Sequence, residues 1–285
     1  MAAEDGARIR GMALDAWRDI RRCPLMWLIL SAASLPVIFH LYFLTPGSPA
    51  SLYLLFLLIG SAVCFVPYFL FWCMAVFFYH GKEREKEGAS YGDAYALMTK
   101  RSRPASLAGA VCGLLTAVAF MVAQIVVSMI LSFMLAGQVS DATLLILSLV
   151  NFYLSYLVAD LALVFIAMVP QMICLEKGNK AEEVIRASYQ VVKARYHDAL
   201  ILFIIPELVT RTLFLGASIV MRYLPNPGLL FSVLLVCMAL LEGARTAFVA
   251  AAFNRFYYRV LEEEKEKKRK AKSKKQPAKK KAGKK

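Results

Sequence analysis

The sequence has few of the residues that build metal sites and disulfide frameworks. It contains three histidines in 285 residues, and its six cysteines stand singly along the chain. No Cys-x-x-Cys pair and no Cys/His cluster occurs, so the sequence supports neither a disulfide framework nor a metal site. We therefore expect no bound metal and no other cofactor.

The sequence also lacks the residue pairs that intramembrane enzymes use. Such enzymes need a nucleophile beside a base, two aspartates on neighbouring helices, or a metal cluster. His40 is expected near the outer end of the first apolar run, whereas His80 and His197 are expected at the inner membrane surface. Because the three cannot converge, we expect no catalytic residues and no enzymatic activity.

Acidic residues are absent from the end of the chain. Residues 267–285 contain twelve Lys or Arg and no acid. Residues 262–285 are therefore predicted to form a disordered, Lys-rich cytoplasmic tail. Lysines next to a membrane gain about 1 kcal/mol each near anionic headgroups, so the predicted partner is a bilayer with anionic headgroups. Contact with nucleic acid is the alternative for the tail, and without interleaved aromatic residues it would be non-specific.

Apolar residues are abundant. They make up 59% of the chain, and the mean hydropathy is +0.57, whereas a soluble protein is about 45–50% apolar. Several apolar runs are long enough to span a bilayer. We predict an all-α polytopic membrane protein with one membrane domain at residues 1–261. Its six transmembrane helices are expected at about 26–44, 52–79, 105–136, 143–172, 199–221 and 228–253.

The distribution of positive charge predicts the orientation. Five Lys or Arg precede the first span, six lie between the second and third spans, and five lie between the fourth and fifth. The other connections contain one or none. Since cytoplasmic segments carry the excess of positive charge, both termini are predicted to be cytoplasmic, in a multi-pass protein of the plasma membrane.

Three basic segments are predicted to form amphipathic helices at the cytoplasmic surface. Residues 7–22 place Ile9, Met12, Ala16 and Ile20 on one stripe, which is typical of a helix lying in the membrane interface. Two more are expected near residues 90–98 and 179–195, the latter with Val184, Ala187, Val191 and Arg195 at helical spacing. The residues expected to contact anionic lipid are Arg21, Arg22, Arg255, Arg259, Lys267, Lys268, Arg269 and Lys270.

Five ionisable residues interrupt the apolar runs. They are Asp160, Glu207, Arg211, Glu242 and Arg245. At 1.5 Å per residue, Asp160 and Arg211 both lie about 18 Å from the cytoplasmic end of their spans. Such residues are costly inside a membrane unless they are partnered. We favour an ion-pair network that fixes helix register; the alternative is a polar site, since three acids against two bases leave one carboxyl without a fixed partner for a proton-coupled transport step.

A stripe of small residues marks the third span. Ala105, Gly109, Gly113 and Ala117 recur every four positions. Small side chains at this spacing allow another helix to approach closely. We therefore predict a close helix–helix contact along this face.

Short motifs in the chain resemble a known group of proteins. They are W-x-x-I-R-R-x-P at 17–24, GKEREKEG-x-x-YGDAY at 81–95, A-S-Y-x-V-V-K at 187–193 and A-x-x-N-R-x-Y-Y at 251–258. The set resembles an uncharacterised prokaryotic multi-pass membrane protein family, similar in layout to the membrane domain that accompanies some glycerophosphodiester phosphodiesterases. The resemblance implies a membrane domain and transfers no catalytic residue.

These observations favour a non-enzymatic role. The first hypothesis is a lipid-facing or scaffolding membrane protein. The alternative is a small transporter or channel that uses the intramembrane charged residues. A homodimer would help the alternative, because six helices alone enclose little pathway.

Overall fold

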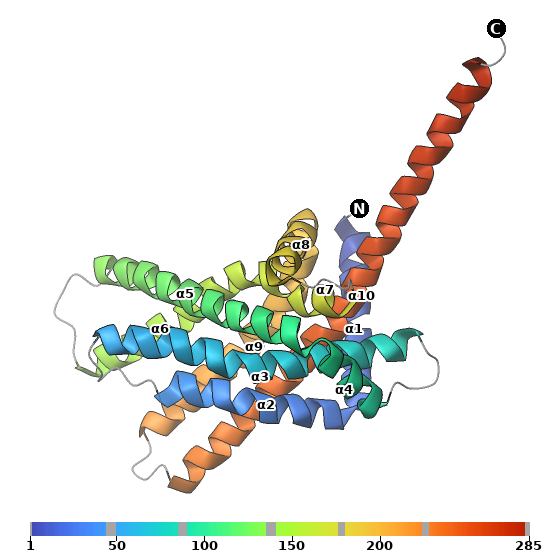
Figure 1. The fold of residues 1–285 in the computed structure, drawn as a ribbon. Helices are drawn as coiled ribbons and strands as arrows, with labels where there is room; N and C mark the ends of the chain where they lie inside the picture. Colours follow the sequence, from blue (N-terminus) through green and yellow to red (C-terminus); the bar gives the residue numbers. More distant parts are fainter. Residues whose placement is uncertain are drawn as a thin grey trace.

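The computed structural model describes residues 2–43, 50–84, 90–134, 141–175, 180–223 and 228–282. All regular elements in these ranges are helices (Figure 1). They are α1 (Ala2–Arg22), α2 (Pro24–Phe43), α3 (Ala50–Arg84), α4 (Tyr91–Lys100), α5 (Ser102–Met134), α6 (Asp141–Leu163), the 3₁₀ helix η1 (Val164–Ile166), α7 (Val169–Leu175), α8 (Ala181–Ala194), α9 (Tyr196–Tyr223) and α10 (Gly228–Ala282).

The described residues contain five helices that are long and apolar enough to cross a membrane. The number is six if α1 and α2, which meet at 90°, form one bent span. The prediction of an all-α protein with several apolar membrane-length helices is confirmed. The predicted spans fall on α2, α3, α5, α6 with α7, α9 and α10.

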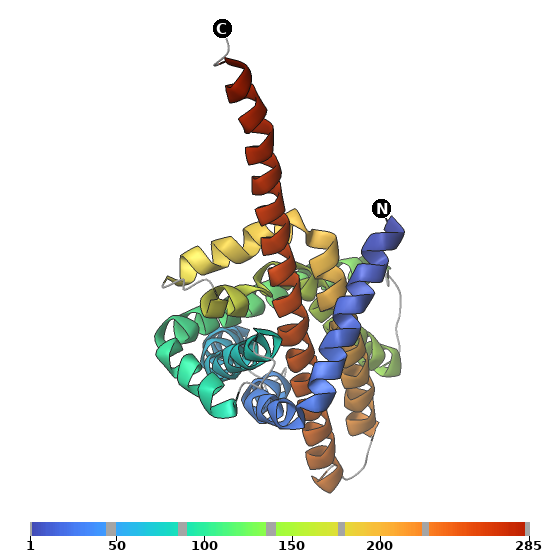
Figure 2. The same ribbon diagram turned by 90° about the vertical axis from the view of Figure 1, so that its right-hand side faces the viewer.

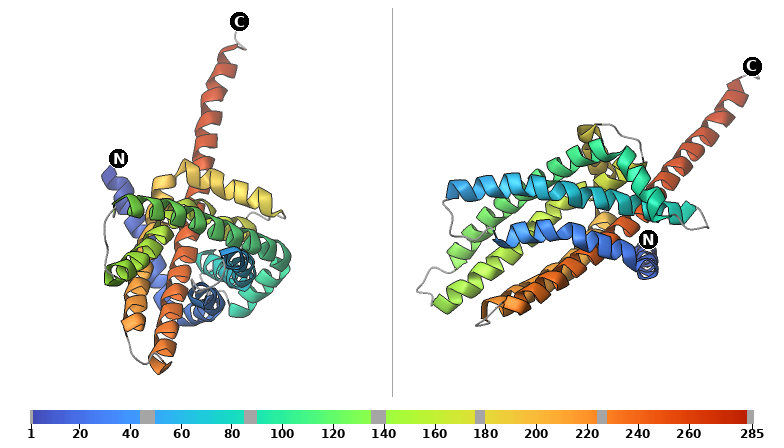
Figure 3. Two further views of the ribbon diagram at one scale, coloured as in Figure 1. Left: turned by 90° about the vertical axis from the view of Figure 1, so that its left-hand side faces the viewer. Right: turned by 60° about the horizontal axis from the view of Figure 1, so that its bottom comes forward.

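The long helices form three antiparallel pairs, α2–α3, α5–α6 and α9–α10, which pack against one another (Figure 3). The short helix α4 packs against α3, and α8 packs against α7 and η1. Helix α10 projects from one end of the bundle, and α1 and α8 lie toward that same end (Figure 2). Six helices can thereby surround one interior.

Small residues allow two helix pairs to come close together. A Cβ added to Gly113 on α5 would lie 2.6 Å from the carbonyl oxygen of Ser61 on α3. A Cβ on Gly243 of α10 would lie 2.6 Å from the backbone nitrogen of Ser31 on α2. Both distances are shorter than any van der Waals contact. The small-residue stripe predicted on the third span is therefore buried and faces α3, which is the close helix–helix contact expected for it.

The fourth span is broken where it contains a proline. Helix α6 ends at Leu163, the chain passes through η1, and α7 begins at Val169. Pro170 lacks an amide hydrogen, and its ring would clash with the carbonyl of Ile166 in a continuous helix. The break lies a few residues before Pro170 for this reason.

The apolar faces of two short helices pack on protein. Ile9, Ala16 and Ile20 of α1 are buried in the main core, and α1 lies against α10. The stripe predicted to enter the membrane interface is thus used for tertiary packing, whereas Trp17 remains half exposed.

On α8 the buried face shares Val184 with the predicted stripe and is then shifted by one position, to Ser188 instead of Ala187 and to Val192 instead of Val191. Ala181, Val184, Ser188 and Val192 are buried, whereas Arg195 caps the helix and is partly exposed. The hydroxyl of Ser188 donates a hydrogen bond to the carbonyl of Phe165 at 2.8 Å. Because of this bond, a polar residue lies at the centre of the buried face. The spacing of hydrophobic residues alone does not predict its burial.

The chain after residue 262 differs from the predicted disorder. Helix α10 continues to Ala282. Glu263, Glu264 and Glu266 each precede a lysine by four positions, an arrangement that stabilises helices, and Lys, Glu and Ala have high helix propensity. Arg259 also pairs with Glu263 at 3.4 Å. This pair and the helix propensity of the residues that follow favour a helix that extends beyond the apolar span.

Candidate functional site

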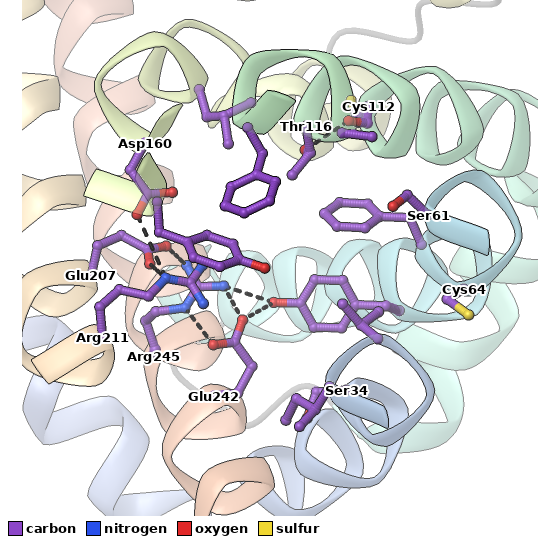
Figure 4. Close-up of a pocket in the computed structure, with 18 of the residues that line it drawn as sticks. Ser34, Ser61, Cys64, Cys112, Thr116, Asp160, Glu207, Arg211, Glu242 and Arg245 are labelled. Atoms are coloured by element: carbon purple, nitrogen blue, oxygen red, sulfur yellow. Dashed lines mark hydrogen bonds and ion pairs between the residues drawn. The ribbon is translucent and has the colours of Figure 1, made fainter. Parts of the chain in front are cut away.

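Five ionisable side chains from three of the long apolar helices meet inside the bundle (Figure 4). Helix α6 supplies Asp160, α9 supplies Glu207 and Arg211, and α10 supplies Glu242 and Arg245. Asp160 and Glu207 are 2% exposed, and Glu242 and Arg245 are 7% exposed. We call these five residues the charged cluster. The structure thus brings together every intramembrane charge that the sequence singled out.

Arg245 is the centre of one half of the cluster. Its Nε donates to Glu242 Oε2 at 3.1 Å, and its Nη2 bonds the other oxygen of the same carboxylate. Its Nη1 pairs with Glu207 on α9. A guanidinium that meets a carboxylate with two parallel bonds is the strongest form of ion pair. Arg245 therefore joins α9 to α10 and compensates most of the charge of Glu242.

Two uncharged residues complete this half. The Tyr68 hydroxyl on α3 accepts a hydrogen bond from Arg245 Nη2 at 2.9 Å and donates one to Glu242 Oε1 at 3.0 Å. Thr246 contacts the same hydroxyl and donates to the Glu242 carbonyl at 2.9 Å. The sequence analysis did not single out either residue, because the sequence does not indicate which neighbour a tyrosine or threonine hydroxyl contacts.

Arg211 is held less completely. Its Nε lies 3.4 Å from Glu207 Oε2 and 3.6 Å from Asp160 Oδ2. Its guanidinium carbon sits 4.7 Å from the ring centroid of Tyr156. Among the described residues, none forms a hydrogen bond with Asp160 Oδ2, Glu207 Oε2 or Arg211 Nε. Buried polar atoms of this kind are rare and costly, so this half of the cluster has bonding capacity that the protein does not use.

A cavity of about 140 Å³ adjoins the cluster. Its walls come from all three antiparallel helix pairs: α2, α3, α5, α6, α9 and α10. The charged cluster forms one side, and Ser61, Cys64 and Thr116 lie across from it (Figure 4). Most of the remaining lining is aliphatic or aromatic. The cavity therefore combines an apolar enclosure with one strongly polar wall.

The residues expected to contact anionic lipid have different environments. Arg21, Arg22 and Arg269 are exposed. Arg255 pairs with Asp19 of α1 at 2.6 Å, and Arg259 pairs with Glu263. The side chains of Lys267, Lys268 and Lys270 lie outside the described part of the structure. Arg255 in particular serves a contact within the protein, since about four-fifths of its side chain is covered.

Comparisons of the chain with protein-family models, with curated proteins and with solved structures give no match. The resemblance to the membrane domain that accompanies glycerophosphodiester phosphodiesterases therefore stays a prediction.

Proposed function

We propose that this chain is a non-enzymatic, multi-pass membrane protein that binds a small hydrophobic molecule in its central cavity. The observation that carries the proposal is the cavity of about 140 Å³ between the six long helices, with the charged cluster as one wall. Small-molecule sites are typically concave and apolar, with a few convergent polar groups that set orientation. This cavity has that composition.

The proposed setting is a cell membrane, with both termini in the cytoplasm. Support comes from the alternation of positive charge between connections. Helices α1 and α8, which contain basic residues, lie toward the end from which the Lys-rich part of α10 projects (Figure 1). At that end, exposed arginines and the tail would contact anionic headgroups.

The outer surface of the bundle suits direct contact with lipid. Helix α5 exposes a row of large apolar side chains, including Leu107, Leu114, Val118 and Phe133, and the last of these is 83% exposed. Such a face is normally covered by lipid tails or by another helix. A homodimer stays a prediction.

A second candidate function is a small transporter. The observation that favours it is the incompletely bonded half of the cluster, where Asp160 and Arg211 border the cavity. A carboxylate without a fixed hydrogen-bond donor inside a membrane is suited to exchange a proton or a substrate. A transporter would first bind its substrate in the cavity, and the cavity would also have to be reachable from both sides of the membrane.

Cysteine labelling tests both candidates. Cys64 lines the cavity, whereas Cys174 is buried elsewhere and Cys237 is exposed. In membranes carrying a variant that keeps Cys64 alone, we expect a small thiol reagent to react with Cys64 and an added hydrophobic ligand to slow the reaction. A matched variant that keeps Cys174 alone should react far more slowly.

The outcomes separate the proposals. If Cys64 reacts no faster than Cys174, the accessible cavity and the proposed function are both wrong. If a membrane-impermeant reagent reaches Cys64 from each side of the membrane in turn, the transporter is supported. If it reaches Cys64 from one side at most, the binding function remains and the transporter is excluded.

A further inference from the structure

We infer that the cavity selects a small hydrophobic cation, such as an organic amine, and that Asp160 and Glu207 provide its counter-charge. The inference rests on the proposed function, because it names the class of molecule that the cavity binds. Four independent features of the site support it: charge, bonding capacity, size and the chemistry of the walls.

The site contains one carboxyl group more than it contains guanidinium groups. Three carboxyl groups face two guanidinium groups, so the charged cluster carries a net charge of −1 when every group is ionised. The other polar side chains on the cavity wall, such as Ser61, Thr116 and Tyr68, are neutral. Inside a membrane an uncompensated charge costs several kcal/mol. A bound cation would remove this cost, whereas a bound anion would increase it.

The unused bonding capacity lies on the side of Asp160. Arg245 donates two hydrogen bonds to Glu242 and one to a single oxygen of Glu207. The remaining positive group, Arg211, has to serve the other Glu207 oxygen and Asp160 at 3.4 and 3.6 Å. Neither of these two oxygens accepts a hydrogen bond from any described residue. Both oxygens are fully covered and face Arg211, so a ligand N–H would bond one of them only after the carboxyl group turned toward the cavity.

The cavity sets the size of the ligand. A dry engineered cavity of about 150 Å³ in another protein accommodates a benzene molecule. At about 140 Å³, this cavity fits one ring or a short branched alkyl group together with its ammonium. Larger molecules would have to displace helices.

The walls favour an organic cation over a hydrated inorganic one. Tyr156, Trp72 and Phe203 are among the aromatic residues that line the cavity. The face of an aromatic ring attracts a cation within about 6 Å by roughly 0.5–2 kcal/mol. Tyr156 already receives the guanidinium of Arg211 in this way, at 4.7 Å. The same walls would cover the hydrocarbon part of an amine.

The test compares three probes of one shape. Purified full-length protein in detergent is titrated with benzylammonium, with the neutral benzyl alcohol and with the anion benzoate, and the dissociation constants are measured by calorimetry. We expect benzylammonium to bind at least about tenfold more tightly than benzyl alcohol, because it gains an ion pair in a low-dielectric site. Benzoate should bind least. This comparison needs no variant, so it holds whatever the variants do to folding.

Variants locate the site. Asp160→Asn should remove the net charge and bring the affinities for benzylammonium and benzyl alcohol to within about twofold of each other. Glu183→Gln makes the equivalent change at an exposed position of α8 and should leave the difference between the two affinities intact. Thr116→Phe adds a ring inside the cavity and should abolish binding of both probes. Ser132→Phe adds the same ring to an exposed position of the same helix and should leave binding unchanged.

Failure of the inference differs from failure of the proposed function. If benzyl alcohol binds as tightly as benzylammonium, and Thr116→Phe abolishes its binding, the cavity binds a hydrophobic molecule and the preference for cations is wrong. If no probe binds, or if Thr116→Phe and Ser132→Phe act alike, both are wrong.

Discussion

Glu207 and Arg245 lie 38 positions apart in the chain and form an ion pair between α9 and α10. Each also has a partner on its own helix: Arg211 for Glu207 and Glu242 for Arg245. The interhelical pair therefore joins two local pairs into one network. Asp160 of α6 enters the same network through Arg211.

Loss of Arg245 should be strongly destabilising. Arg245→Met would leave Glu207 and Glu242 buried without their main partner, and breaking a buried pair in this way costs about 3–5 kcal/mol. The effect is measured by heating the detergent-solubilised protein and recording the fraction that stays monodisperse at each temperature. Arg18→Met is the matched control, because Arg18 pairs with Asp15 on the surface and its side chain is 69% exposed. If the two variants are equally stable, the network does not hold the bundle together.

The helix contacts at Gly113 and Gly243 should not tolerate larger side chains. Gly113→Val and Gly243→Val place atoms where backbone atoms of α3 and α2 already lie, at 2.6 Å from a new Cβ. Overpacking of this kind costs about 1–3 kcal/mol, and more where backbone must move. We expect a lower unfolding temperature for each variant.

Gly216 provides the control for this prediction. It lies on helix α9, and no atom from outside its own stretch of that helix lies within 4 Å of a Cβ added there. Gly216→Val introduces the same side chain and should leave the unfolding temperature unchanged or raise it slightly, since glycine is a poor helix former. Equal losses at all three positions would show that the valine itself, and not the helix contact, is responsible.

Charge reversal should test the contact between α1 and α10. Asp19 and Arg255 pair at 2.6 Å with side chains about 20% exposed. Arg255→Asp places two acids together and should cost about 1–2 kcal/mol, a value between those of exposed and buried pairs. The double variant Asp19→Arg with Arg255→Asp should recover most of the loss. If the double variant is no more stable than Arg255→Asp alone, the Asp19–Arg255 ion pair does not stabilise the contact between α1 and α10.

Binding of the tail to membranes should depend on salt. A peptide of residues 262–285 should bind vesicles that contain anionic lipid and should dissociate when the salt concentration rises from about 0.1 M to about 1 M, because the Debye length falls from about 10 Å to about 3 Å. Neutral vesicles and a peptide with Lys replaced by Gln are the controls. Binding that is insensitive to salt, or stronger binding to DNA than to vesicles, would overturn the proposed lipid contact.

Much of the helical layout follows from the sequence. The apolar runs predicted as spans fall on the observed long helices, and Pro24 and Pro170 fall where helices begin or break. These features depend on local properties: backbone groups must be satisfied within each helix in an apolar medium, and proline cannot donate a hydrogen bond. The five charged residues were also visible in the sequence, because charges are rare in such runs.

The roles of particular side chains did not follow in the same way. Tyr68 and Thr246 were missed, and beyond Val184 the buried face of α8 was displaced by one position. Each error concerns the partner of a polar group, Ser188 with the carbonyl of Phe165 being one case. Hydrophobic spacing predicts which side of a helix is covered, but the identity of the atoms that cover it depends on another part of the chain.

The sequence by itself determined that the chain forms long apolar helices and that five charges lie among them, because both depend on composition and on distances along one helix. Only the tertiary structure decided that Arg245 takes Glu207 and Glu242 as partners and leaves Asp160 with Arg211 beside a cavity. The physical reason is that each pairing depends on how neighbouring helices are rotated and placed, and the packing of small residues such as Gly113 and Gly243 sets that placement.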